Sequence, residues 1–94
     1  MTMVNLVPVE VTVGCDVFTG RPRWVRVGPE EVSVQAIERI RKESAAYPVS
    51  EGPRTLFVVR TAQARLRLSF RHRERRWLME GIDTAAVQPQ AVAA

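Results

Sequence analysis

Three segments in the last third of the chain alternate apolar and polar residues and are separated by short polar turns. They span residues 56–61, 66–71 and 76–80. A period of two is typical of a strand that buries one face, and consecutive strands joined by short turns usually lie side by side in antiparallel orientation. The sequence therefore predicts a three-stranded antiparallel meander in this part of the fold.

The turns also predict how these strands pair. If residues 62–65 form the first turn, Phe57 lies opposite Phe70, and if residues 72–75 form the second turn, Phe70 lies opposite Trp77. This register places apolar side chains on one face of the meander and arginines on the other. A slip by one residue would turn arginines toward the core, which is costly for an unpaired charge.

The N-terminal third shows the same alternation in shorter segments. Valines at every second position predict a strand over residues 7–13, and a turn at residues 19–22 precedes a second short strand over residues 23–27. Strand-like alternation resumes at residues 32–34 after a Gly-Pro dipeptide, which is typical of a hairpin.

Residues 35–46 allow two interpretations. Three apolar residues lie at helical spacing, and Glu38 precedes Lys42 by four positions, the favoured order for an ion pair on a helix. The apolar residues are Ala36, Ile37 and Ile40. The β-branched residues of this region also fit a long bent strand with a bulge, at which the alternation shifts by one. We favour a helix of about three turns here.

Length and composition bound the architecture. A chain of 94 residues with 46% hydrophobic residues has room for one small core, so we expect a single domain over residues 1–83 and a disordered tail over residues 84–94. The predicted fold class is β-rich α+β, a small antiparallel sheet or partly open barrel with the C-terminal meander and at most one helix. The predicted core consists of Val9, Val11, Phe57, Val59, Leu66, Leu68, Phe70, Trp77 and Met79.

Composition argues against several classes of function. Cys15 and His72 are the only cysteine and the only histidine, so we expect neither a disulfide framework nor a zinc site, and no cofactor is predicted. The sequence has no nucleophile–base pair, no phosphate-binding glycine loop and no G-x-S-x-G motif, so we expect no enzyme. No apolar run is long enough to span a bilayer and no signal peptide is recognised, so we expect a soluble cytoplasmic protein without a membrane partner.

The basic charge is concentrated in the second half of the chain. Eight arginines follow Pro53 against only three carboxylates, so the whole formal net charge of +4 originates there. Arginine binds phosphates and carboxylates through a planar, bidentate fork. The arginines predicted to form a basic sheet face and the adjoining turn are Arg60, Arg65, Arg67, Arg71, Arg73, Arg75 and Arg76, and Trp24 is added as an aromatic that can stack on bases.

Two functions from different classes follow from this distribution. The first is a non-enzymatic module that binds the DNA or RNA backbone through the arginine-rich face without reading sequence. The second is an adaptor that docks on an acidic protein partner, or a homo-oligomer that forms through an open sheet edge. A basic face that is merely solvated is the third interpretation that the composition allows.

Several short motifs also resemble a known domain. The order Pro8-Val9-Glu10-Val11, Gly20-Arg21-Pro22, Phe57-Val58-Val59-Arg60-Thr61, Arg76-Trp77-Leu78 and Ile82-Asp83 is similar to a small uncharacterised bacterial domain. That domain is found alone or at the C-terminus of proteins similar to mutagenesis-associated Y-family DNA polymerases. The resemblance implies a compact, mostly antiparallel, barrel-like fold and a role in DNA damage tolerance, with no activity to carry over.

Overall fold

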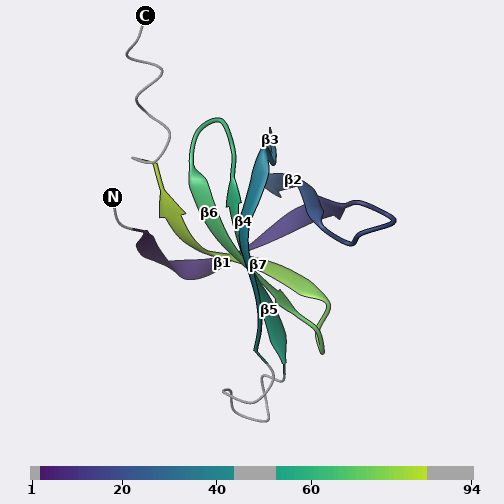
Figure 1. Cartoon of the computed structure of the whole chain (residues 1–94). Helices are drawn as coiled ribbons and strands as arrows, with labels where there is room; N and C mark the ends of the chain where they lie inside the picture. The colour runs from purple at the N-terminus through teal and green to yellow at the C-terminus, as the bar shows by residue number, and fades with distance from the viewer. Residues whose placement is uncertain (1–2, 44–52, 85–94) are drawn as a thin grey trace, which may run out of the picture.

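The computed structural model describes residues 3–43 and 53–84. Within these residues the chain forms seven strands and no helix (Figure 1). The strands are β1 (Val4–Cys15), β2 (Pro22–Val27), β3 (Glu30–Ser33), β4 (Ala36–Glu43), β5 (Arg54–Arg60), β6 (Arg65–Arg71) and β7 (Arg76–Asp83). The tail predicted to be disordered lies outside the described residues from position 85 onward.

The seven strands form one curled antiparallel sheet in the order β3-β2-β1-β7-β6-β5-β4. The long strand β1 pairs with β7 within residues 4–11 and with β2 along residues 12–15, so it connects the two parts of the sheet. The two outermost strands, β3 and β4, follow each other in the chain. Between them Val34 N–H donates to Arg23 C=O (2.8 Å) and Gln35 N–H donates to Arg60 C=O (2.7 Å). The two edge strands of the sheet, β3 and β4, therefore meet at a corner, and the curled sheet forms a partly open barrel.

The core lies on the inner face of this curl. Leu68, Val59 and Val25 are completely buried there, and they come from both halves of the sheet. Trp77 packs against the rings of Phe57 and Phe70, with centroid distances of 5.3 and 4.9 Å. Most of the predicted core is confirmed, although Phe70 and Trp77 are only partly buried against it. Val9 is 44% exposed, because this part of β1 has β7 on one side and no described strand on the other.

The predicted helix is wrong, because residues 36–43 form strand β4. The ladder sets Ile37 opposite Val59 but Arg39 opposite Val58, so Glu38 is an additional residue in a β-bulge. The bulge moves the next inward position from 39 to 40, and two strand positions on one face become three residues apart. Apolar side chains three residues apart are also typical of a helix, which is why the sequence pattern favoured one. The bent strand with a bulge is the interpretation that holds, and the α+β class is corrected to an all-strand fold for the described residues.

The meander is confirmed, but its first hairpin pairs two residues away from the predicted register. Phe57 lies opposite Leu68 and not opposite Phe70. The turn begins at Thr61, because the Thr61 hydroxyl accepts a hydrogen bond from Ala64 N–H (3.1 Å) and donates one to Ala64 C=O (2.9 Å). A shift of two residues leaves every side chain on its predicted face. In the second hairpin the predicted pairing of Phe70 with Trp77 is confirmed.

The turn between β1 and β2 is held by the side chain of Asp16. Its carboxylate accepts hydrogen bonds from the backbone N–H groups of Phe18 (2.8 Å) and Thr19 (2.9 Å), and Gly20 closes the turn with a φ of +73°. Such Asx turns fix the backbone without any packed side chains. Val17 and Phe18 are accordingly 88% and 93% exposed at the tip, which extends to the right in Figure 1.

The Asp16 turn makes the order of this tip dependent on pH. The N–H groups of Thr19 and Phe18 hold the pKa of Asp16 below its ordinary value of 3.8. Because the folded-state pKa is the lower one, the turn is stabilised above the unfolded pKa, and this contribution is lost as pH falls through the folded value. In an NMR titration we expect the amide signals of Phe18 and Thr19 to move together with a midpoint below 3.8.

The variants Asp16→Asn and Asp16→Ala test the cause. Asparagine keeps an acceptor oxygen without titrating, so the tip should stay ordered and the acid transition should disappear. Alanine should leave both amides without their acceptor and increase their hydrogen-exchange rates at neutral pH. A midpoint at or above 3.8 in the unmodified chain would contradict this account.

Candidate functional site

The face of β4–β7 that points away from the core carries eight arginines. Cross-strand partners share a face, and the ladder sets Arg54 opposite Arg71 and Arg71 opposite Arg76 at one end of the strands. We call this surface the arginine face, and its members are Arg39, Arg41, Arg54, Arg60, Arg65, Arg67, Arg71 and Arg76. Six carboxylates lie among or beside these eight arginines, which leaves the face with a net positive charge. They are Glu10, Glu38, Glu43, Glu74, Glu80 and Asp83.

The remaining strands carry no net charge. Between residues 11 and 35, three arginines are balanced by Asp16, Glu30 and Glu31. The excess positive charge of the described residues is therefore carried by the arginine face and the β6–β7 turn. A local excess of this kind raises the concentration of anions near the surface.

A hollow of about 570 Å³ lies within the arginine face. Five arginines line it, and the apolar side chains of Leu56 and Val58 also border it. The five are Arg39, Arg41, Arg54, Arg65 and Arg67. Glu38 and Glu80 also line the hollow, so its walls present forked cationic donors interleaved with carboxylates.

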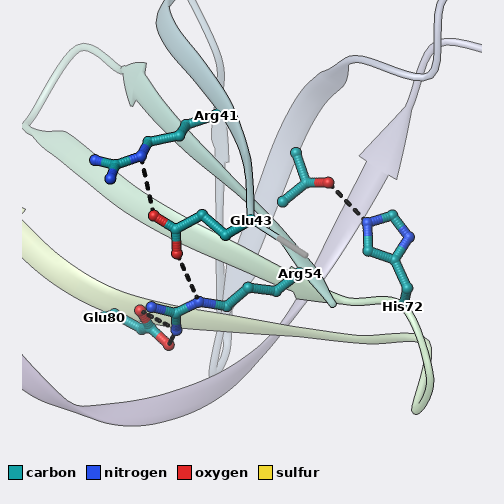
Figure 2. A network of polar contacts seen from close by, with 6 residues as sticks. Arg41, Glu43, Arg54, His72 and Glu80 are labelled. Atoms are coloured by element: carbon teal, nitrogen blue, oxygen red, sulfur yellow. Dashed lines mark hydrogen bonds and ion pairs between the residues drawn. The ribbon is translucent and has the colours of Figure 1, made fainter. Parts of the chain in front are cut away.

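Figure 2 shows that ion pairs connect β4, β5 and β7 on this face. Arg54 of β5 lies between Glu43 of β4, at 3.4 Å, and Glu80 of β7, at 3.0 Å. Arg41 holds the other oxygen of Glu43 at 3.0 Å. The Arg54, Glu43 and Glu80 side chains are only 18%, 11% and 12% exposed, whereas Arg41 is 65% exposed. Arg54 is thus the inner member of the network and reaches across β6, and Arg41 is its solvent-exposed end.

A second group of ion pairs fixes the other end of the hollow. Glu38, the bulge residue, lies 2.8 Å from Arg65 and 3.8 Å from Arg60. Arg65 also approaches the buried Asp83 at 3.6 Å. The bulge in β4 therefore does more than bend the strand, because it directs a carboxylate between two arginines that lie opposite each other on β5 and β6.

Arg76 is paired across the β1–β7 boundary. Its guanidinium contacts Glu10 at 2.8 Å and Glu74 at 3.8 Å. The hydrogen bond from Arg76 and its positive charge hold the pKa of Glu10 below the ordinary value, and the same contact raises the pKa of Arg76. This pair is exposed, so it orients Arg76 but adds little to stability.

Three arginines of this face have no carboxylate partner among the described residues. Arg39 and Arg71 make no ion pair there, and Arg67 is held by neutral groups instead. The Arg67 guanidinium donates to the amide oxygen of Asn5 and to Glu80 C=O (3.2 Å). Its central carbon passes within 3.3 Å of the point where a side chain on Gly81 would begin, so the glycine provides the space it occupies.

The structure brings together part of the predicted site. Five predicted arginines lie on the arginine face: Arg60, Arg65, Arg67, Arg71 and Arg76. Arg73 and Arg75 lie in the β6–β7 turn, where Arg75 has a φ of +56°. Trp24 lies on β2 apart from this surface; it covers Gly14, and Arg26 stacks on its ring at 5.3 Å.

Three arginines of the hollow were missed by the sequence analysis. Arg39 and Arg41 belong to the segment predicted as a helix, and Arg54 precedes the predicted start of β5 by two residues. The signal for Arg54 was available, since it continues the alternation of Leu56 and Val58 toward the N-terminus. Arg39 and Arg41 could be placed only once the bulge at Glu38 is known.

His72 makes a separate contact at the same end of the sheet. Its ring nitrogen lies 2.7 Å from the hydroxyl of the buried Thr55, and its ring meets Phe70 edge to face at 5.0 Å. Figure 2 marks the contact of the His72 ring by a dashed line. These contacts fix the start of the β6–β7 turn. In the described part of the chain no group of three or more His, Cys, Asp or Glu residues is arranged to hold a metal ion.

Comparisons with known proteins add no relative. No protein-family description, no curated protein and no solved structure matches the chain. Among the described residues no helix is long and apolar enough to cross a membrane.

The ion-pair network leads to a prediction about stability. We expect Arg54→Met to lower the free energy of unfolding by about 3 kcal/mol, because it leaves Glu43 and Glu80 largely buried without their shared cation. Arg41→Met is the matched control: it removes an exposed contact to the same Glu43 and should cost less than about 1 kcal/mol. Urea unfolding of the two variants checks this, and equal losses would show that Arg54 does not hold the strands together.

Proposed function

We propose that the arginine face binds the phosphate backbone of nucleic acids. The observation that carries the proposal is that Arg39, Arg67 and Arg71 have no carboxylate partner within residues 3–43 and 53–84 and lie on a face of net positive charge, with Arg39 and Arg67 lining the hollow. A cation whose charge is not neutralised within the protein remains available for a phosphate. Guanidinium groups also match phosphate geometry bidentately.

The paired arginines support the same function in a different way. Glu38, Glu43 and Glu80 hold Arg54, Arg60 and Arg65 in place, so less side-chain entropy is lost when a ligand binds among them. The same carboxylates lower the total attraction for a polyanion. We therefore propose weak, sequence-independent binding, with dissociation constants of roughly 10⁻⁴ to 10⁻⁶ M at physiological salt, as is typical of backbone contacts alone.

The floor of the hollow argues for the backbone and not for the bases. Leu56 and Val58 border it, and the aromatic rings of Phe57, Phe70 and Trp77 belong to the inner face. Stacking on bases requires exposed aromatic rings. Trp24, the half-buried aromatic on the outer side, lies on β2 beside Gly14 and away from the hollow.

Binding can be measured by fluorescence anisotropy with labelled single-stranded and duplex oligonucleotides of unrelated sequence. We expect similar affinities for different sequences and a logarithm of affinity that falls linearly with the logarithm of salt concentration. The double variant Arg39→Gln plus Arg71→Gln should weaken binding at least about tenfold and reduce the salt slope by roughly 2, since each lost phosphate contact reduces it by about 1.

The matched control is Arg21→Gln plus Arg23→Gln. It removes the same charge from the β1–β2 hairpin and, in dilute protein that is monomeric, should leave the salt slope almost unchanged. Equal losses in the two double variants would show that only net charge matters, and binding that does not respond to salt would exclude a backbone interface. The role in DNA damage tolerance implied by the resemblance stays a prediction.

A further inference from the structure

A second hollow, of about 470 Å³, opens between β3 and the β5–β6 turn. Its walls come from the apolar inner face of the sheet, with Leu66, Met79 and Ile82 on one side and Val27 and Val32 on the other. Leu66 and Met79 belong to the buried core, so the hollow reaches it directly. An apolar concavity that remains open to solvent is a typical site for an apolar side chain of a partner.

Two carboxylates also line this hollow. Glu31 is paired with Arg26 at 2.8 Å, whereas Glu30 is exposed and has no ion pair within the described residues. The apolar walls and the acidic groups together select a ligand that combines an apolar group with a nearby positive charge.

The chain itself displays such a group. At the tip of the β1–β2 hairpin, Val17 and Phe18 are almost completely exposed, and the Asp16 carboxylate accepts hydrogen bonds from the backbone N–H groups of Phe18 and Thr19. Arg21 follows the tip without an ion pair among the described residues, and Arg23 has only a distant contact with Asp16 at 3.9 Å. An exposed aromatic ring near Arg21 and Arg23 is thus complementary to the second hollow in both polarity and charge.

We propose that the chain self-associates head to tail, with Phe18 and Val17 of one copy inserted in the second hollow of the next. Arg21 and Arg23 then lie beside Glu30 and Glu31 of that copy. The contact forms between copies, because the exposure of Phe18 shows that it does not occupy the hollow of its own chain. Since two different surfaces meet, the interface is heterologous, and each copy keeps one free tip or one free hollow unless a ring closes.

This inference does not rest on nucleic-acid binding. None of its residues belongs to the arginine face, so either proposal can fail alone. In Figure 1 the tip lies at the right of the view and β3, which borders the second hollow, lies at the top, so the two elements lie apart in one copy.

Sedimentation velocity over a concentration series, from low micromolar to millimolar, tests the association in the absence of nucleic acid. We expect the average mass to rise with concentration. Phe18→Ser should weaken this association roughly 10- to 100-fold, the loss expected for an aromatic side chain that becomes buried. Val7→Ser is the matched control, since it removes another highly exposed apolar side chain, on β1, and should change nothing.

A charge exchange identifies the orientation. Glu30→Arg and Arg21→Glu should each weaken self-association when studied alone. When the two variants are mixed, the altered tip of the Arg21→Glu chain matches the altered hollow of the Glu30→Arg chain, and the unaltered tip and hollow still match each other. Head-to-tail association should therefore be restored, with the two variants alternating in equal amounts. A chain that stays monomeric at all concentrations, an association unaffected by Phe18→Ser, or a mixture that forms no complex would each overturn the proposal.

Discussion

One antiparallel sheet must provide both the core and the surface of this protein, because no helix covers either face within residues 3–43 and 53–84. A sheet of this size can shield its apolar side from water only by curling on itself. Two features produce this curl. Strand β1 changes its partner from β7 to β2 along its length, and the chain turns a corner at Val34 and Gln35 between β3 and β4. The two-residue period of the strands then assigns the alternate positions to the outside, where the arginines lie.

That assignment creates an electrostatic conflict on the outer face. Arg54, Arg71 and Arg76 lie directly opposite one another on three adjacent strands, and like charges at such positions destabilise a sheet. Ion pairs with carboxylates on neighbouring strands relieve the repulsion. Arg54 pairs with Glu43 and Glu80, and Arg76 pairs with Glu10. The charge left over after this pairing is what the surface offers to an anion. Fold stability and ligand attraction therefore compete for the same guanidinium groups.

Sequence patterns predicted the faces of the strands better than their ends. The faces follow from apolar alternation alone, so Phe70 and Trp77 were paired correctly and a two-residue error at Phe57 moved nothing across the sheet. The error itself came from the Thr61 hydroxyl, a local hydrogen bond that alternation does not reveal. The helix error had the same origin, since one additional residue at Glu38 converts the strand period into helical spacing. Arg39 and Arg41 were lost from the predicted site with it.

The two proposed contacts would reinforce each other in an assembly. Copies joined through the tip and the second hollow keep their arginine faces uncovered, because the hollow opens on the inner face of the sheet and none of the residues that line it belongs to the arginine face. A row of weak sites acts as one strong site on a long polyanion, since the second contact is intramolecular once the first has formed. The low charge of each face after ion pairing would then be sufficient, because repetition would multiply the weak affinity of each copy. Salt would act mainly on the phosphate contacts, whereas the joint keeps its apolar part.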